Sequence, residues 1–161
     1  MKTKVTFFTI FFLGLAVQLM AQQNEPLLSV LSVFKITVDD KGNETAEETT
    51  KVTPGDTLEY RLKYTNNDVG AITMLKPILP IPVGMEFIKG SPIPAIEGAS
   101  VSNTGNDFQS LPLTRQIRQP NGTVVTEEVP VREYRRLQWM IESLDVGESV
   151  ILVARVKVID K

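Results

Sequence analysis

A group of oxygen-bearing side chains close together in the sequence is the first feature that could do chemistry. Asp39, Asp40, Asn43 and Glu44 supply carboxylate and amide oxygens on one short polar stretch. Calcium takes several such oxygens on a flexible loop, so these four residues are candidate calcium ligands. Their spacing matches no complete calcium-loop motif. The alternative is a solvated turn, because Asp, Gly and Asn are favoured in turns for backbone reasons.

The only concentration of basic side chains lies between residues 115 and 136 and is made of arginines. An anionic glycan or a nucleic-acid backbone is one possible ligand for such a patch. However, acidic residues alternate with the arginines, and opposite charges on paired strands are the ordinary explanation. The formal net charge of −2 also opposes nucleic acid as a partner. The residues concerned are Arg115, Arg118, Arg132, Arg135 and Arg136, with Glu127, Glu128 and Glu133 between them.

The chain has no cysteine and no histidine, which removes much catalytic chemistry. Disulfides, thiol nucleophiles, Ser-His-Asp triads and ordinary zinc or haem sites are excluded. A glycosidase needs only two carboxyl groups across a sugar cleft. None of the 19 acidic residues lies in an aromatic-rich segment suited to sugar stacking. We therefore predict no catalytic residue, no cofactor and no enzymatic activity, with a hydrolase as the third hypothesis.

The N-terminal residues have the pattern of a secretory signal peptide. Lys2 and Lys4 precede an uncharged apolar run over residues 5–20, and Ala21 is a small residue at the expected cleavage site. We expect a signal peptide over residues 1–21 and a short polar segment over residues 22–27. The alternative is an uncleaved anchor, but the run is shorter than the roughly twenty residues that span a membrane.

These features predict export and no transmembrane span in the mature chain. Small exported eukaryotic domains usually rely on disulfides, so an exported chain without cysteine indicates a bacterial protein. We expect it in the periplasm, at the cell surface or outside the cell of a Gram-negative bacterium.

The rest of the chain alternates apolar and polar residues in the manner of β-strands. Over residues 57–64, Leu and Tyr occupy one face, and Thr, Glu, Arg and Lys the other. Residues 137–141 and 149–159 repeat the pattern. Residues 28–38 form the opening strand, whose apolar side changes partway along, which predicts a bulge. A turn over residues 39–43 follows it, and then a polar stretch.

Turn residues divide the remaining sequence into short strands. Proline limits the pairing of the apolar strand expected over residues 71–79, which suits a sheet edge. Asn121 and Gly122 predict a two-residue hairpin between strands over residues 113–119 and 123–131. No helical stripe is present. We expect an all-β fold, an immunoglobulin-like antiparallel β-sandwich of about seven to nine strands in a single domain over residues 28–161. A small barrel is the alternative.

Three segments resemble a known bacterial family. Pro54, Gly55 and Asp56 open a strand, an aromatic strand follows a Pro-x-Gly turn over residues 81–91, and residues 137–158 carry a Gly turn before the last strand. In order and spacing these are similar to the conserved-repeat domain of bacterial envelope and secreted proteins, an immunoglobulin-like β-sandwich domain of unknown function often found in tandem.

The match covers residues 52–90 and 137–158. Leu79 and Pro80 stand where the family usually has an acidic residue, and residues 99–136 exceed a minimal repeat. The family has no shared catalytic residues, so the resemblance implies an extracytoplasmic structural or binding module.

Taken together, the sequence predicts a non-enzymatic exported module that is a structural or a binding component of the cell envelope, with an envelope protein or a glycan as its partner. The alternative is a self-assembling surface or fibre subunit, a homo-oligomer in which residues 22–38 insert at the open edge of a neighbouring copy.

Overall fold

A computed structural model describes residues 25–159 of the chain. The predicted signal peptide over residues 1–21 lies outside the described residues, as do residues 22–24 of the polar segment. Within the described range the protein is all-β, as predicted, with twelve strands, one single-turn 3₁₀ helix (η1, Val131–Glu133) and no α-helix. The strands are β1 Leu27–Val38, β2 Glu44–Glu48, β3 Thr57–Asn66, β4 Ile72–Leu75, β5 Ile78–Pro80, β6 Met85–Phe87, β7 Gly98–Ser100, β8 Thr114–Arg118, β9 Val124–Glu128, β10 Arg136–Gln138, β11 Ile141–Leu144 and β12 Ser149–Val158.

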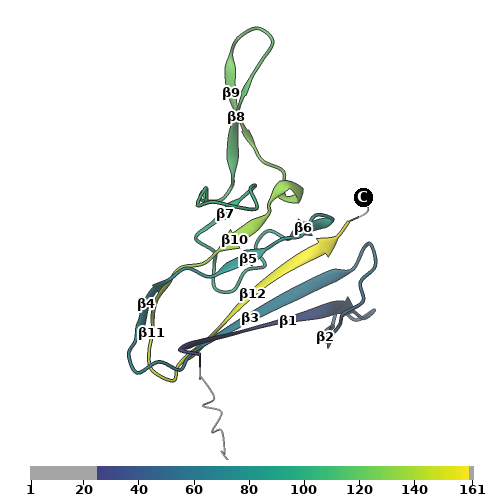
Figure 1. Ribbon diagram of the computed structural model, residues 1–161. Coiled ribbons are helices and arrows are strands. Elements are labelled where there is room, and N and C mark those ends of the chain that lie inside the picture. The colour runs from purple at the N-terminus through teal and green to yellow at the C-terminus, as the bar shows by residue number, and fades with distance from the viewer. Residues whose placement is uncertain (1–24, 160–161) are drawn as a thin grey trace, which may run out of the picture.

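A five-stranded antiparallel sheet forms one layer of the molecule, in the order β2-β1-β3-β12-β6 (Figure 1). Its long central strands are the segments with the clearest period-two pattern. On β3 the alternation places Leu58, Tyr60 and Leu62 on the inner face. Leu152 and Ala154 of β12 lie directly opposite Leu62 and Tyr60, so the two strands present one continuous apolar surface.

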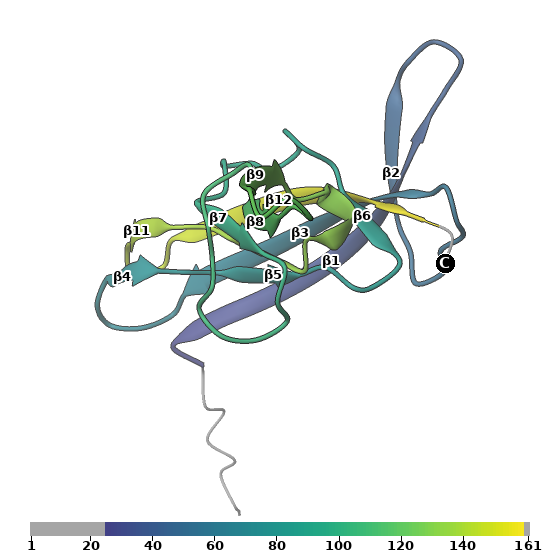
Figure 2. The ribbon, with the colours of Figure 1, turned by 90° about the horizontal axis from the view of Figure 1, so that it is seen from above.

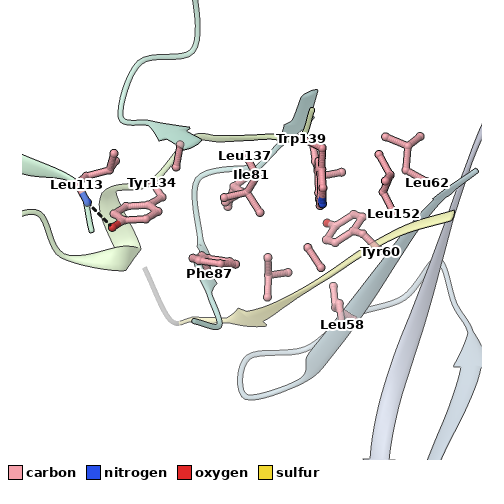
Figure 3. Close-up of a cluster of buried hydrophobic side chains, with 14 of the residues drawn as sticks. Leu58, Tyr60, Leu62, Ile81, Phe87, Leu113, Tyr134, Leu137, Trp139 and Leu152 are labelled. Carbon is pink, nitrogen blue, oxygen red and sulfur yellow. Dashed lines mark hydrogen bonds between the residues drawn. The ribbon is translucent and has the colours of Figure 1, made fainter. Parts of the chain in front are cut away.

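A three-stranded sheet, β5-β10-β7, packs over that surface and encloses the core. Figure 3 shows Trp139 next to Tyr60 and Leu152, and Leu137 next to Ile81 on the side of Phe87. The indole N–H of Trp139 donates to the carbonyl of Pro94 at 2.8 Å, so the buried ring leaves no polar group unpaired. The buried residues that form this core are Leu58, Tyr60, Leu62, Leu79, Ile81, Phe87, Ala99, Leu113, Val129, Tyr134, Leu137, Trp139, Leu152, Ala154 and Val156.

Two further strand pairs extend from this body. The β4–β11 pair lies at one end, opposite the turn of the β1–β2 hairpin (Figure 2). The β8–β9 hairpin projects from the second layer (Figure 1).

The described residues contain more strands than the predicted seven to nine, for three identifiable reasons. The apolar segment over residues 71–79 divides into β4 and β5 next to Pro77, which has no N–H to donate. The segment that pairs with β4 and β5 is divided at the same place, into β10 and β11. Between the divided strands, the backbone N–H of Trp139 donates to the Pro77 carbonyl at 3.0 Å. The polar stretch after the first turn forms β2, whose residues are all exposed.

The predicted bulge in the opening strand was wrong. Register between β1 and β3 is unbroken from Leu27 to Ile36. The apolar side chains at Leu28, Val30 and Leu31 fall on both faces because this part of β1 is solvent-exposed on both sides. The hairpin predicted around Asn121 and Gly122 is confirmed, with β8 and β9 paired antiparallel and Gly122 at φ 87°. The predicted two-residue loop was wrong: the Gln119 N–H donates to the Thr123 carbonyl at 2.8 Å, so the loop also includes Pro120.

We predict that Gly98→Ala destabilises the protein by about 1–3 kcal/mol through overpacking. Gly98 lies in β7, and an added Cβ would sit 2.8 Å from the backbone oxygen of Gln109, which has little freedom to move because Gln109 is bridged to Ala99. Urea unfolding measures the change.

Gly70→Ala is the matched control, since nothing lies within 4 Å of a Cβ at that position. Equal stabilities for the two variants would contradict the close approach of the loop to β7.

Candidate functional site

The β8–β9 hairpin is the most prominent protrusion of the described structure, and local sequence explains its shape. Gly122 takes the left-handed conformation that the tight turn requires. Asn121 accepts a hydrogen bond from the Thr123 N–H at 3.0 Å through its side-chain oxygen. Nearly every side chain of the two strands is exposed, so the hairpin presents side chains to solvent instead of filling a core.

The base of the hairpin is fixed to the body by buried residues. Leu113 and Val129 flank the two strands, are almost fully buried, and pair through a 2.8 Å backbone hydrogen bond. The Tyr134 hydroxyl accepts the N–H of Leu113 at 3.1 Å, and its ring stacks on Phe87 with 5.9 Å between centroids (Figure 3). The hairpin therefore leaves the body in a defined direction.

Ion pairs link the lower part of the hairpin to its surroundings. Arg115 bonds Glu133 of η1 at 2.7 Å and Glu127, its cross-strand neighbour, at 3.2 Å. These hydrogen bonds raise the pKa of Arg115 above its ordinary value. Lys89 forms an ion pair with Glu128 on β9, and this hydrogen bond raises the pKa of Lys89. All these groups are solvent-accessible, so each pair orients the hairpin more than it stabilises the fold.

An apolar pocket of about 510 Å³ opens at the base of the hairpin. Its walls come from the end of β6, from the loop that follows β6 and from the loop that precedes β8. The Lys89–Glu128 pair supplies its charged groups. A volume of this order is typical of ligand pockets, which combine apolar walls with a few polar groups. The lining residues are Phe87, Lys89, Gly90, Pro92, Ala95, Ile96, Leu111, Pro112 and Glu128.

Sequence reasoning did not assign this pocket. Its lining residues lie mainly in loops between the strands. In a loop, apolar residues follow no periodic pattern, so the sequence does not indicate which of them are buried. The only signal was the presence of Pro, Ile and Leu side chains in those loops. Lys89 and Glu128 are 39 positions apart, so their pairing depends on the tertiary fold.

The arginines predicted as one basic concentration are not gathered into one patch. Arg115 pairs with Glu127 and Glu133, as the cross-strand explanation predicted. Arg118 and Arg132 are exposed. Arg135 donates to the carbonyls of Arg132 and Tyr134 at 2.7 and 2.8 Å.

Arg136, the first residue of β10, is only 7% exposed. Its guanidinium donates to the carbonyls of Ser102, Thr104 and Gly105 at 2.7–2.8 Å and to the carboxylate of Asp107 at 2.6 Å. It also lies over the Phe108 ring, 4.6 Å from the centroid. The loop after β7 is folded around this one side chain, which alternation along β10 could not reveal.

The four calcium candidates serve the first turn and the sheet. Asp39 accepts hydrogen bonds at 2.8 Å from the Lys41 and Asn43 backbone N–H groups and from the Asn43 side chain. The Asn43 side-chain bond, followed by the backbone bonds, lowers the pKa of Asp39. Glu44 is directed to Arg155, and Asp40 is exposed. Among residues 25–159 no group of three or more acidic side chains is placed to hold a metal ion.

The outer face of the five-stranded sheet carries an ion-pair network centred on Glu59. We expected Glu59 on an open charged face, but it is only 6% exposed. Arg155 bonds Glu59 at 2.8 Å, Arg61 bonds it at 2.7 Å, and Arg61 lies over the Phe34 ring at 4.1 Å. Arg155 also reaches both carboxylate oxygens of Glu44. Glu44 lies on β2, and two strands, β1 and β3, separate β2 from β12 in the sheet. Glu44 can contact Arg155 of β12 because the β1–β2 hairpin bends out of the plane of the sheet (Figure 2).

Comparisons with known proteins give no relative for this chain: no family model, no curated protein and no solved structure matches it. The described residues also contain no helix that is long and apolar enough to cross a membrane.

We predict that millimolar calcium produces no binding heat with the purified protein, because the Asp39 and Glu44 oxygens are already hydrogen-bonded. Isothermal titration calorimetry measures it, with Asp39→Ala as the comparison. A saturable heat that this substitution abolishes would restore the four residues as ligands.

We predict that Glu59→Gln lowers the free energy of unfolding by about 1–2 kcal/mol at pH 7, since it removes the charge that both arginines share. Burial opposes ionisation of Glu59, but the hydrogen bonds from Arg155 and Arg61 outweigh it and lower its pKa below the ordinary value of 4.5. The folded pKa is therefore below the unfolded one. The stabilisation is present above pH 4.5 and is lost as the pH falls through the folded pKa.

Denaturant unfolding at pH 7 and pH 3 checks this dependence. The difference between wild type and Glu59→Gln is expected to shrink at the lower pH. Glu142→Gln, on an exposed position of β11, is the control and is expected to change little at either pH. A difference that does not vary with pH would contradict the network.

Proposed function

We propose that this protein is a non-enzymatic binding module that holds a protein partner at the β8–β9 hairpin and the apolar pocket beneath it. The observation that carries the proposal is the combination of a rigidly anchored protrusion with an apolar cavity at its base. Protein interfaces commonly have an apolar centre that accepts an anchor side chain and a polar rim.

The chemistry of the pocket favours a polypeptide over a glycan. Phe87, Ile96 and Leu111 offer apolar contact, and the charged groups available are Lys89 and Glu128 at the rim. A sugar presents many hydroxyl groups that would need polar partners on burial. An apolar side chain of a partner protein needs none, and its polar surroundings can meet the charged hairpin.

The fold family and the cellular location of the module are proposed from the sequence. We propose an immunoglobulin-like sandwich related to the conserved-repeat domain and exported to the envelope of a Gram-negative bacterium. The two packed antiparallel sheets and the buried Trp139 support this assignment. The strand order differs from that of an immunoglobulin domain in one respect. Here the last strand, β12, lies in the same sheet as β1 and pairs with β3, whereas in the immunoglobulin order the first and last strands lie in different sheets.

Self-assembly by strand exchange stays a prediction. In the described structure β1 pairs with β3 of its own chain, from Leu27 to Ile36. Deleting residues 22–38 tests this alternative: a strand donor would still fold but lose its oligomers, whereas a strand integral to the sheet would be needed for stability.

We predict that Leu111→Glu abolishes partner binding without unfolding the protein. Leu111 lines the pocket and is 41% exposed, so a charge there spoils the apolar surface at small cost to the fold. Tagged wild type and variant are cross-linked in the native envelope and captured, and the recovered proteins are quantified by mass spectrometry. One protein is expected in the wild-type sample and depleted about tenfold with the variant, the effect of losing one hot-spot contact.

Val69→Glu is the matched control, because Val69 is 96% exposed in the turn between β3 and β4, away from the hairpin. It is expected to recover the same protein as wild type. Recovery of an identical set from all three samples would exclude the pocket as the binding site.

A further inference from the structure

The N-terminal half of β1 leaves one backbone edge of the five-stranded sheet without a partner among residues 25–159. β2 covers β1 only from Phe34 to Val38, and the last bond on that side joins the Thr49 N–H to the Val33 carbonyl at 3.1 Å. Backbone groups alternate in direction along a strand. Leu27, Ser29 and Leu31 therefore direct their N–H and C=O groups away from β3, at the outer edge that Figure 1 shows along β1.

This edge has none of the features that usually prevent strand addition. Natural sheets protect their edges with charged side chains, proline, bulges or very short strands. No charge, proline or bulge interrupts β1 from Leu27 to Phe34. The flanking side chains are apolar and open to solvent, with Leu28 42%, Val30 47% and Leu31 49% exposed.

The other edges of the same sheet are protected. β2 has the sequence ETAEE and is fully exposed, so its three glutamates repel a second acidic strand. β6 is only three residues long. Beyond the end of β6, the edge of β12 is paired through a bridge between Ile93 and Val153. The unprotected stretch of β1 thus stands out within its own sheet.

We propose that this edge pairs antiparallel with the same edge of a second copy, about a two-fold axis at Ser29. The sequence Leu-Leu-Ser-Val-Leu over residues 27–31 is symmetric in residue class about its centre. In this register Leu27 faces Leu31 of the second copy on one side of the sheet, and Leu28 faces its Val30 on the other. Apolar residues meet apolar ones, no like charges meet, and each hydrogen-bonded pair exchanges two backbone bonds.

The two ends of the free edge match this register. At the N-terminal end the strand begins at Leu27, and Pro26 before it directs its carbonyl to the Asn67 N–H at 2.8 Å, on the β3 side. At the other end, the Val33 carbonyl is already taken by Thr49. The available backbone groups are those of Leu27, Ser29 and Leu31, which are the ones that a two-fold axis at Ser29 pairs. A short interface of this kind retains β1 in its own sheet and so differs from strand exchange.

A single cysteine tests the axis, because the chain contains none. In Ser29→Cys the two cysteines would form a hydrogen-bonded pair with their Cα atoms about 5.5 Å apart, within the range for a disulfide. Mild oxidation of the purified protein is expected to give a covalent dimer about tenfold faster than it does for Ser32→Cys, which lies on the same strand but off the axis. Non-reducing gels measure both rates.

Sedimentation velocity over a range of concentrations supplies the second measurement. Wild type is expected to shift from monomer to dimer as concentration rises, and Val30→Lys is expected to remain monomeric. Ile151→Lys is the control: it lies on the same outer face, in register with Lys63 and Val30 but two strands inside the edge, and is 53% exposed. It is expected to dimerise like wild type.

A wild type that stays monomeric at every concentration, with Ser29→Cys and Ser32→Cys oxidising equally fast, would overturn the proposal and leave the edge to a strand of another protein. The pocket proposal fails separately, since Leu111→Glu is expected to dimerise normally.

Discussion

The burial of the inner faces of β3 and β12 beneath Leu137 and Trp139 is the interaction on which the rest of the structure depends. With no cysteine in the chain, no disulfide assists the fold, and apolar burial must hold the two layers together. Each large side chain in this core contributes about 1.5–3 kcal/mol when fully buried. The hairpin that carries the candidate site is tied to the same core through Leu113 and Tyr134, so its orientation is set by the packing of the body.

The outer face of the large sheet is stabilised by a different means. No second sheet covers it in the described structure, yet Glu59 is nearly buried there. Arg61 and Arg155 lie over it, and the β1–β2 hairpin brings Glu44 to Arg155 from beyond the sheet edge. Removing one member of such a network leaves the others unpaired, so the network favours one position of β2 over others. This explains why a short, fully exposed, glutamate-rich strand keeps a defined place.

Sequence reasoning succeeded where local pattern determines structure and failed where distant residues do. The alternation along residues 57–64 and the Asn-Gly turn identified β3 and the β8–β9 hairpin, because both signals lie within a few residues. The burial of Glu59 and Arg136 was not predictable, since it depends on Arg155 and on a loop folded from about 30 positions away. The pocket was missed for the same reason: its walls come from four separate loop and strand segments. The calcium candidates show the converse situation, in which one short polar stretch fits both a partial ligand set and a turn held by local hydrogen bonds.

The proposed site and the proposed dimer edge have a spatial relation that bears on how such a module would work. The β8–β9 hairpin projects from the second layer, and the free part of β1 lies along the far edge of the large sheet, so the two point away from each other (Figure 1). Pairing through β1 would therefore leave both pockets open and joined through one continuous sheet. Two sites held at a fixed separation bind a repetitive or oligomeric partner far more tightly than one site does, because the second contact forms at high effective concentration. A weak affinity of each single pocket would then be enough for tight binding to a repetitive partner. If the short dimer edge forms only at high local protein concentration, tight binding would occur only where the protein is concentrated.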